Sequence, residues 1–294
     1  FNLFINKLNL NNVKGMLGAI IGDTVGSVYE FNNTKSLDFP LFSEGSIYTD
    51  DSIISLAVAK WLIVDKEHTH RELERIMVEF AERYPNPCGS YGGGFLNWLF
   101  YPEKIEKGEN SEISTVRYPY KSWGNGSAMR VSAVGWVFDT LEETERVAEI
   151  SASITHNHTE GIKGAQATAA AIYLARTGSS KEDIKNYIES KYGYDLSRNW
   201  DDLHLTYGWD SSCQGTVPEA IIAFLSSSNF EDAIRRAVAL GGDSDTLACI
   251  TGAIAEAFYQ EIPKEMVLET INRLPKYLRD TLEDFQKMIG YFKC

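Results

Sequence analysis

Apolar residues recur at intervals of three and four positions along almost the whole chain, which is the spacing of helices that bury one face. The first such pattern starts at Val13 and continues to about residue 30. Later patterns lie at 53–62, 73–80, 131–137, 140–154, 165–175, 247–258, 266–271 and 278–289, with capping-box helix starts at 216 and 228. No alternation of apolar and polar residues is long enough to indicate a strand. The pattern predicts an all-α protein.

Nothing in these patterns marks a boundary between domains, and no internal repeat is visible. We therefore expect residues 13–294 to form a single domain. Residues 1–12 alternate apolar residues with asparagine and lack the basic and apolar regions of a signal peptide. We treat them as an N-terminal extension, part of which could come from an expression vector.

Three glycines share one face of the first predicted helix, because Gly18, Gly22 and Gly26 are four residues apart. Each glycine weakens a helix by up to about 1 kcal/mol, so this face is expected to meet another backbone or a ligand closely. Asp23 and Glu30, seven residues apart, are expected on a common face of the same helix. Taken alone, this pair favours a solvent-exposed acidic edge.

Oxygen-bearing side chains gather at a turn between two helical patterns, in the stretch Gly241-Gly242-Asp243-Ser244-Asp245-Thr246. The two glycines permit a sharp turn and the last two residues open an apolar helix, so three oxygen ligands can converge on one divalent cation. Aspartate, serine and threonine are also the preferred helix caps, which explains the stretch without a metal. A second cluster of the same kind would favour the metal.

That second cluster is Thr49-Asp50-Asp51, which precedes a helix that is apolar almost all round. A helix buried on every side begins inside the molecule, where two adjacent carboxylates are costly unless a cation or several donors compensate them. A single acid would suffice as a cap. Together the two clusters favour a metal centre.

Two glycine-rich stretches are candidates for binding phosphate. Gly92, Gly93 and Gly94 form a flexible turn, and Gly124 to Arg130 leads into an apolar segment with backbone N–H groups and an arginine available to an anion. Each signal is weak alone, because plain turns have the same composition.

His156 and His158 precede an alanine-rich helix. No third soft ligand stands near them in the sequence, so hydrogen bonding or helix capping is favoured over zinc binding. The polar segment 102–122 is expected to be a surface or lid loop. The aromatic segment 193–215 is expected either to stack on a ring or to form a hydrophobic lid over the core.

Composition narrows the function further. A net charge of −13 and a pI near 4.9 argue against the broad basic face that nucleic acid or an anionic membrane requires. No run of eighteen apolar residues occurs, and the four cysteines lack C-x-x-C spacing, which is typical of free thiols in a reducing compartment. We expect a cytoplasmic monomer without nucleic-acid or membrane partners.

Six motifs stand in the order in which they occur in the ADP-ribosylglycohydrolases. They are Gly22-Asp23-x-x-Gly26-x-x-x-Glu30, Tyr48-Thr49-Asp50-Asp51, Gly92-Gly93-Gly94, Gly124-Asn125-Gly126-Ser127-Ala128-Met129-Arg130, His156-Asn157-His158 and Gly242-Asp243-Ser244-Asp245-Thr246. The chain resembles that family, which includes dinitrogenase reductase-activating glycohydrolase and the eukaryotic ADP-ribosylhydrolases. The resemblance covers about residues 13–260, and coincidence does not explain six ordered motifs.

The resemblance implies a compact orthogonal helical bundle with a centre of two Mg²⁺ or Mn²⁺ ions. It implies as metal ligands Thr49, Asp50, Asp51, Asp243, Asp245 and Thr246. The catalytic residues it implies are Glu30 and Asp51. The substrate would be bound by Gly92, Gly93, Gly94, Gly124, Asn125, Gly126, Ser127, Met129 and His158.

The activity implied is hydrolysis of the glycosidic bond between ADP-ribose and a modified protein side chain, which reverses mono-ADP-ribosylation. The partners are then an ADP-ribosylated protein and the product ADP-ribose. An arginine linkage is favoured because the bacterial members that the chain resembles include arginine-specific ones, and serine or another hydroxyl stays open. The alternative is a non-catalytic ADP-ribose binder or structural homologue, because a fold can persist after its activity is lost.

Overall fold

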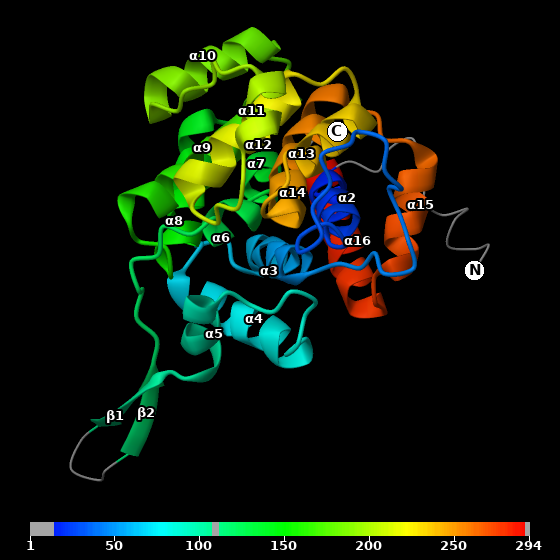
Figure 1. Cartoon of the computed structure of the whole chain (residues 1–294). Coiled ribbons are helices and arrows are strands. Elements are labelled where there is room, and N and C mark those ends of the chain that lie inside the picture. The colour runs from blue at the N-terminus through cyan, green and yellow to red at the C-terminus, as the bar shows by residue number, and fades with distance from the viewer. Residues whose placement is uncertain (1–14, 108–111, 292–294) are drawn as a thin grey trace.

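The computed structural model describes residues 15–107 and 112–291, so Val13 and the 1–12 extension lie outside the described residues (Figure 1). The helices are α2 (Leu17–Gly26), α3 (Asp50–Val64), α4 (His70–Arg83), α5 (Gly93–Phe100), α6 (Gly126–Met129), α7 (Val134–Val137), α8 (Leu141–Ser153), α9 (Thr159–Arg176), α10 (Lys181–Tyr192), α11 (Trp200–Thr206), α12 (Cys213–Leu225), α13 (Phe230–Ala239), α14 (Ser244–Tyr259), α15 (Lys264–Arg273) and α16 (Lys276–Tyr291). The prediction of an all-α fold is confirmed.

Helices α2 and α14 pack directly against each other at the centre of the molecule. The glycine face of α2 makes this possible: a Cβ at Gly22 would lie 1.9 Å from the Ala248 carbonyl oxygen, and one at Gly18 would lie 2.2 Å from that of Gly252. The expectation of a close approach is therefore confirmed, and the partner is a backbone. The contact brings the C-terminal end of α2 beside the N-terminal end of α14.

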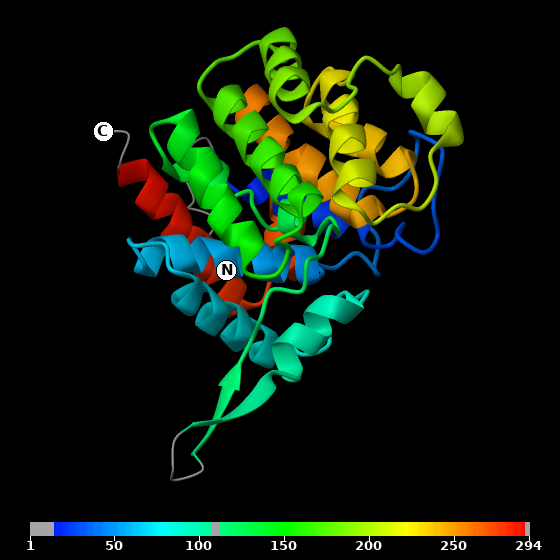
Figure 2. The same ribbon diagram turned by 90° about the vertical axis from the view of Figure 1, so that its left-hand side faces the viewer.

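The other helices surround this central pair. Helices α8, α9, α12 and α13 lie on one side of it, and α3, α4 and α16 lie on the other (Figures 1 and 2). Helix α3 is buried on almost every side, as its sequence predicted, so its N-terminus with Asp50 and Asp51 begins inside the molecule.

A two-stranded hairpin projects from the helical body within the segment expected to be a surface or lid loop (Figure 2). Strand β1 (Glu103–Lys107) pairs antiparallel with β2 (Glu112–Val116). The expectation that strands are absent is wrong here. These ten residues are mostly charged or polar and do not alternate over a buried face, so the sequence contains no strand signal.

The first helix is shorter than predicted, because α2 ends at Gly26 and residues 27–32 form turns and bends. Asp23 and Glu30 therefore do not share a helix face. Asp23 is fully buried, so the expectation of a solvent-exposed acidic edge is wrong for it. Among the described residues, no helix combines the length and apolar character needed to cross a bilayer.

Candidate functional site

The carboxylate of Asp23 connects α2 to the start of α3. Its two oxygens accept hydrogen bonds from the Thr49 backbone N–H at 2.9 Å, the Thr49 hydroxyl at 2.6 Å and the Ser52 N–H at 3.1 Å, and the Ser52 hydroxyl donates a fourth. Burial raises the pKa of Asp23 to about 6, although these hydrogen bonds lower it. Asp23 thus fixes the position of the Thr49-Asp50-Asp51 cluster. Sequence analysis missed this role, because Asp23 becomes buried only when α3 packs against it.

Both predicted acid clusters meet at one place. Ligand oxygens of Asp23, Asp51 and Asp245 lie within 4.8 Å of one another, and so do those of Glu30, Asp243 and Asp245. Asp245 belongs to both groups. This convergence follows from the packing of α2 on α14, where a Cβ at Gly26 would lie only 2.4 Å from the Asp245 Cα.

The carboxyl groups of the acid cluster are buried and repel one another. Burial raises the pKa values of Asp50, Asp51 and Asp245 well above the ordinary carboxyl range, and repulsion from neighbouring carboxylates adds to the effect. The Asp51 Oδ1 atom is buried and has no hydrogen-bond partner among the described residues. Converging carboxylate oxygens with an unpaired buried oxygen fit a divalent cation of the Mg²⁺ or Mn²⁺ type.

Glu30 lies beside this cluster on the turn after α2 and is partly exposed. Burial, then repulsion from Asp243 and Asp23, raises the pKa of Glu30 to about 7. A Cβ at Gly89 would lie 2.8 Å from a Glu30 carboxylate oxygen, so the loop before α5 closes on this side chain. A carboxyl group with such a pKa can hold or release a proton near neutral pH.

A cavity of about 400 Å³ opens above the acid cluster and collects most of the predicted site residues. Those that line it are Glu30, Asp50, Asp51, Gly92, Gly93, Gly94, Gly124, Asn125, Gly126, Met129, Asp243, Asp245 and Thr246. Thr49, Ser127 and His158 are predicted residues that do not line it. Thr49 bonds to Asp23 beneath the cluster, and the buried Ser127 hydroxyl donates to the Gly161 carbonyl at 2.7 Å.

The Gly124–Gly126 turn also supports the acid cluster. The Asn125 side-chain amide donates to Asp243 Oδ2 at 2.8 Å and to the Thr216 hydroxyl at 3.1 Å. Asn125 is predicted to bind substrate, and the structure shows in addition that it orients Asp243. The sequence contains no signal for this contact between residues 118 positions apart.

The two histidines of the H-x-H motif have different positions. His158 caps α9, where its Nδ1 accepts a hydrogen bond from the Glu160 N–H at 3.1 Å. His156 lines the cavity, and its Nδ1 lies 2.7 Å from the Thr155 hydroxyl oxygen. Burial, then the nearby Arg130 charge, lowers the pKa of His156 well below its ordinary value, so the ring is neutral at pH 7. The resemblance gave His158 as the substrate-binding histidine, whereas His156 is the one that lines the cavity.

Arg130 was a candidate for supporting a phosphate. Its side chain is almost fully buried, and its Nη2 donates to the Ser151 carbonyl and to the Thr155 hydroxyl, both at 2.8 Å. Arg130 reaches the lining of the cavity, but these bonds commit one end of its guanidinium to α8 and the loop after it. It therefore holds the Thr155 and His156 segment in place.

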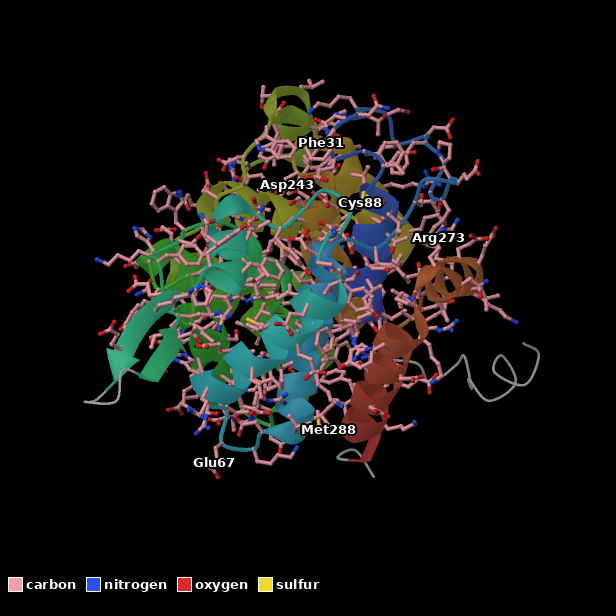
Figure 3. All side chains as sticks on the ribbon, turned by 90° about the horizontal axis from the view of Figure 1, so that it is seen from below. Phe31, Glu67, Cys88, Asp243, Arg273 and Met288 are labelled. Carbon is pink, nitrogen blue, oxygen red and sulfur yellow. The ribbon has the colours of Figure 1, made fainter. Side chains whose placement is uncertain are left out.

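Aromatic side chains complete the cavity, and one of them, Trp209, comes from the predicted aromatic segment 193–215. The rings of Phe31, Tyr120 and Trp209 line it, and Figure 3 shows Phe31, Asp243 and Cys88 gathered on one side of the molecule. A larger open depression of about 910 Å³ runs along α4, but Arg75 in it forms salt bridges with Glu72 and Glu79, and Arg117 forms one with Glu74. We therefore place the functional site in the smaller cavity.

Comparison with known proteins shows the family of the chain. A family model described as ADP-ribosylglycohydrolase matches residues 8–291. The chain is similar to ADP-ribosylhydrolase ARH3 of Mus musculus, at 25% identity over 87% of this chain and 86% of that one. It is 34% identical to a protein of Archaeoglobus fulgidus over 85% of this chain and 88% of the other. A solved structure titled "ADP-ribosylglycohydrolase-related protein complex" shares the fold, with a TM-score of 0.70, 21% identity and coverage of 95% and 98% of the two chains.

Proposed function

Because the chain belongs to the ADP-ribosylglycohydrolase family, we propose that it is a metal-dependent ADP-ribosylhydrolase that removes ADP-ribose from a modified protein side chain. The observation that carries the proposal is that two clusters of carboxylates meet at Asp245, and that one of them contains Glu30. The cavity above them is lined by glycine-rich turns, which would hold the diphosphate and its riboses. Mono-ADP-ribosylation would thereby be reversed.

Two divalent cations, Mg²⁺ or Mn²⁺, are proposed for the cluster. The residues that would hold them are Thr49, Asp50, Asp51, Asp243, Asp245 and Thr246. Asp245 lies close to Asp51 in one cluster of carboxylates and to Asp243 in the other, which supports two neighbouring sites that share Asp245 as a ligand. When bound, such ions polarise ribose hydroxyls and acidify a nearby water.

Glu30 and Asp51 are the proposed catalytic residues. Cleavage adds the oxygen of a water molecule to the anomeric carbon of the ribose and breaks the bond from that carbon to the acceptor nitrogen or oxygen. One proton leaves the water and one proton reaches the departing acceptor atom. Glu30, with a pKa of about 7, is suited to both transfers, and Asp51 orients the ribose side of the site from the start of α3.

The substrate would lie across the cavity. The Gly92–Gly94 turn opens α5, and a Cβ at Gly92 or Gly93 would meet no atom within 4 Å, which leaves room for the diphosphate. Gly124 to Met129 would contact the adjacent ribose. His158 stays a prediction for the distal ribose, and His156 is the histidine whose ring already lines the cavity.

The linkage proposed is to arginine, with serine or another hydroxyl as the second candidate. Release of ADP-ribose from arginine-linked and serine-linked peptides, with and without EDTA, tests the function. We expect release with metal and none with EDTA. Metal-independent release would refute the mechanism, and tight ADP-ribose binding without release from any linkage would indicate a non-catalytic binder.

A further inference from the structure

Two large aromatic rings stand exposed at the cavity beside the acid cluster. Phe31 is 75% exposed and Trp209 is 54% exposed, and both belong to the lining of the cavity. Their ring centroids lie 5.8 Å apart with an interplanar angle of 18°, so they stack on each other. Exposed apolar rings side by side are unfavourable in water, which suggests that they are kept for contact with a ligand.

The backbone on each side of the pair is held firmly in place. Asn33, two residues after Phe31, exchanges hydrogen bonds of 2.9 Å with both the N–H and the carbonyl of Gly242. The Lys35 ammonium donates to the carbonyls of His204 and Tyr207 at 2.9 Å. The segments that carry the two rings are therefore tied to each other and to the turn before Asp243.

Gly208 packs closely against Gly242 in the turn before Asp243. A Cβ added to Gly242 would lie 2.6 Å from the Gly208 carbonyl oxygen. Trp209 follows directly in the sequence. Phe31 likewise follows Glu30 directly. The ring pair thus borders Glu30 and Asp243, the acids at the edge of the cluster.

The charge of the cavity is divided between two regions. Within the lining that the structure describes, Arg130 is the positively charged side chain. The neutral His156 ring lies beside it, and its Nε2 faces the Gly124–Gly126 turn, 3.1 Å from a Cβ placed on Gly126. That region suits the anionic diphosphate. The region of Phe31, Trp209 and Glu30 has no basic side chain among these lining residues, so it suits a cation.

We propose that Phe31 and Trp209 form the subsite for the leaving group, and that the leaving group they fit is the guanidinium of an arginine side chain. A planar cation stacks on the face of tryptophan and is attracted by its π electrons, while Glu30 supplies the opposite charge. A serine hydroxyl is small and neutral, so neither the tryptophan ring nor the Glu30 carboxylate would bind it strongly. The inference rests on the proposed hydrolase function, and it assigns recognition of the ADP-ribosylated side chain to Phe31 and Trp209.

The test compares two peptides of one sequence, ADP-ribosylated on arginine or on serine, with wild type and three variants. Trp209→Ala should lower kcat/KM on the arginine-linked peptide about 5- to 30-fold and change it less than about twofold on the serine-linked one. Trp209→Phe retains a ring and should lose less. The matched control is Leu205→Ala, on the same segment, 77% exposed and outside the cavity lining, which should change neither.

Calorimetric titration with ADP-ribose and Mg²⁺ should give each variant the wild-type affinity, which shows that the rest of the cavity is intact. Equal losses on both peptides, or no loss on either, would overturn the subsite. So would a wild type that cleaves only the serine linkage, although the proposed function would then survive. A wild type that cleaves neither peptide refutes the proposed function, and the subsite with it.

Discussion

Gly22→Ala places a methyl group into the tightest contact between α2 and α14. The new Cβ would lie 1.9 Å from the Ala248 carbonyl oxygen and 2.3 Å from its carbonyl carbon. A carbon and an oxygen in contact normally stay about 3.3 Å apart, so the helices must separate by about 1.4 Å. Both neighbours are backbone atoms, which no change of rotamer can move away.

Separating the helices in this way lowers the free energy of unfolding, as overpacking of a core does. Overpacked cores lose about 1–3 kcal/mol, and the gain of about 1 kcal/mol from replacing glycine by alanine in a helix offsets part of it. Because the contact is backbone against backbone, we expect the upper end of that range and a net loss of about 2 kcal/mol. For a chain of this size the melting temperature should fall by about 3 °C.

Thermal and urea unfolding of Gly22→Ala and of the control Gly290→Ala measure the effect. Gly290 lies in α16 and is exposed, and a Cβ added there would meet no atom of the described residues within 4 Å, so its substitution should be neutral or slightly stabilising. Activity should also fall in Gly22→Ala, because Asp23 moves with α2. If both variants unfold like wild type, the α2–α14 contact does not set the position of the acid cluster.

Three further predictions concern the acid cluster. Asp23→Ala leaves the Thr49 and Ser52 donors without their acceptor, so the free energy of unfolding in urea should fall by about 3 kcal/mol. Asp23→Asn keeps an acceptor oxygen and should cost less, and equal effects of the two variants would contradict the hydrogen-bonding role. Adding Mg²⁺ or Mn²⁺ should raise the melting temperature, by the equivalent of about 2.7 kcal/mol at 100 times the dissociation constant, and an unchanged temperature across a titration would argue against a shared site. In EDTA, the free energy of unfolding should fall as the pH rises from about 4 to 7. The reason is that Asp23 and Glu30, with pKa values of about 6 and 7, bind more protons in the folded chain than in the unfolded one. A free energy of unfolding that rises over this range would contradict the buried cluster.

Much of the fold could be predicted because its signals are local. Helical periodicity identified the core helices, and the four-residue spacing of glycines predicted the close contact of α2. The β1–β2 hairpin was missed, since its ten residues are mostly charged or polar and show no regular alternation. The end of α2 was placed too late because apolar residues continue beyond Gly26 into the turn.

The acid cluster could be predicted in part for the same reason. Asp50 with Asp51 and Asp243 with Asp245 are close in the sequence, so each pair is visible without a structure. Asp23 gained its role only from the packing of α3, far away along the chain. Phe31, Trp209 and His156 are likewise brought to the cavity by tertiary contacts.

The central claim is that Asp245 binds metal whereas Glu30 acts on the substrate. Asp245→Asn removes a negative charge that belongs to both clusters of carboxylates, so metal affinity should fall. Activity should then return in part at high Mg²⁺ or Mn²⁺. Glu30→Gln should retain metal and lose about 100- to 10,000-fold in kcat, the usual contribution of a general acid or base.

The most direct test measures calorimetric metal affinity and kcat together for wild type, Asp245→Asn and Glu30→Gln. The account predicts weakened metal binding in Asp245→Asn and near wild-type metal binding with a large loss of kcat in Glu30→Gln. If Glu30→Gln loses metal as strongly as Asp245→Asn, Glu30 is itself a metal ligand, and if it retains full kcat, Glu30 takes no part in the reaction; either result contradicts the assignment.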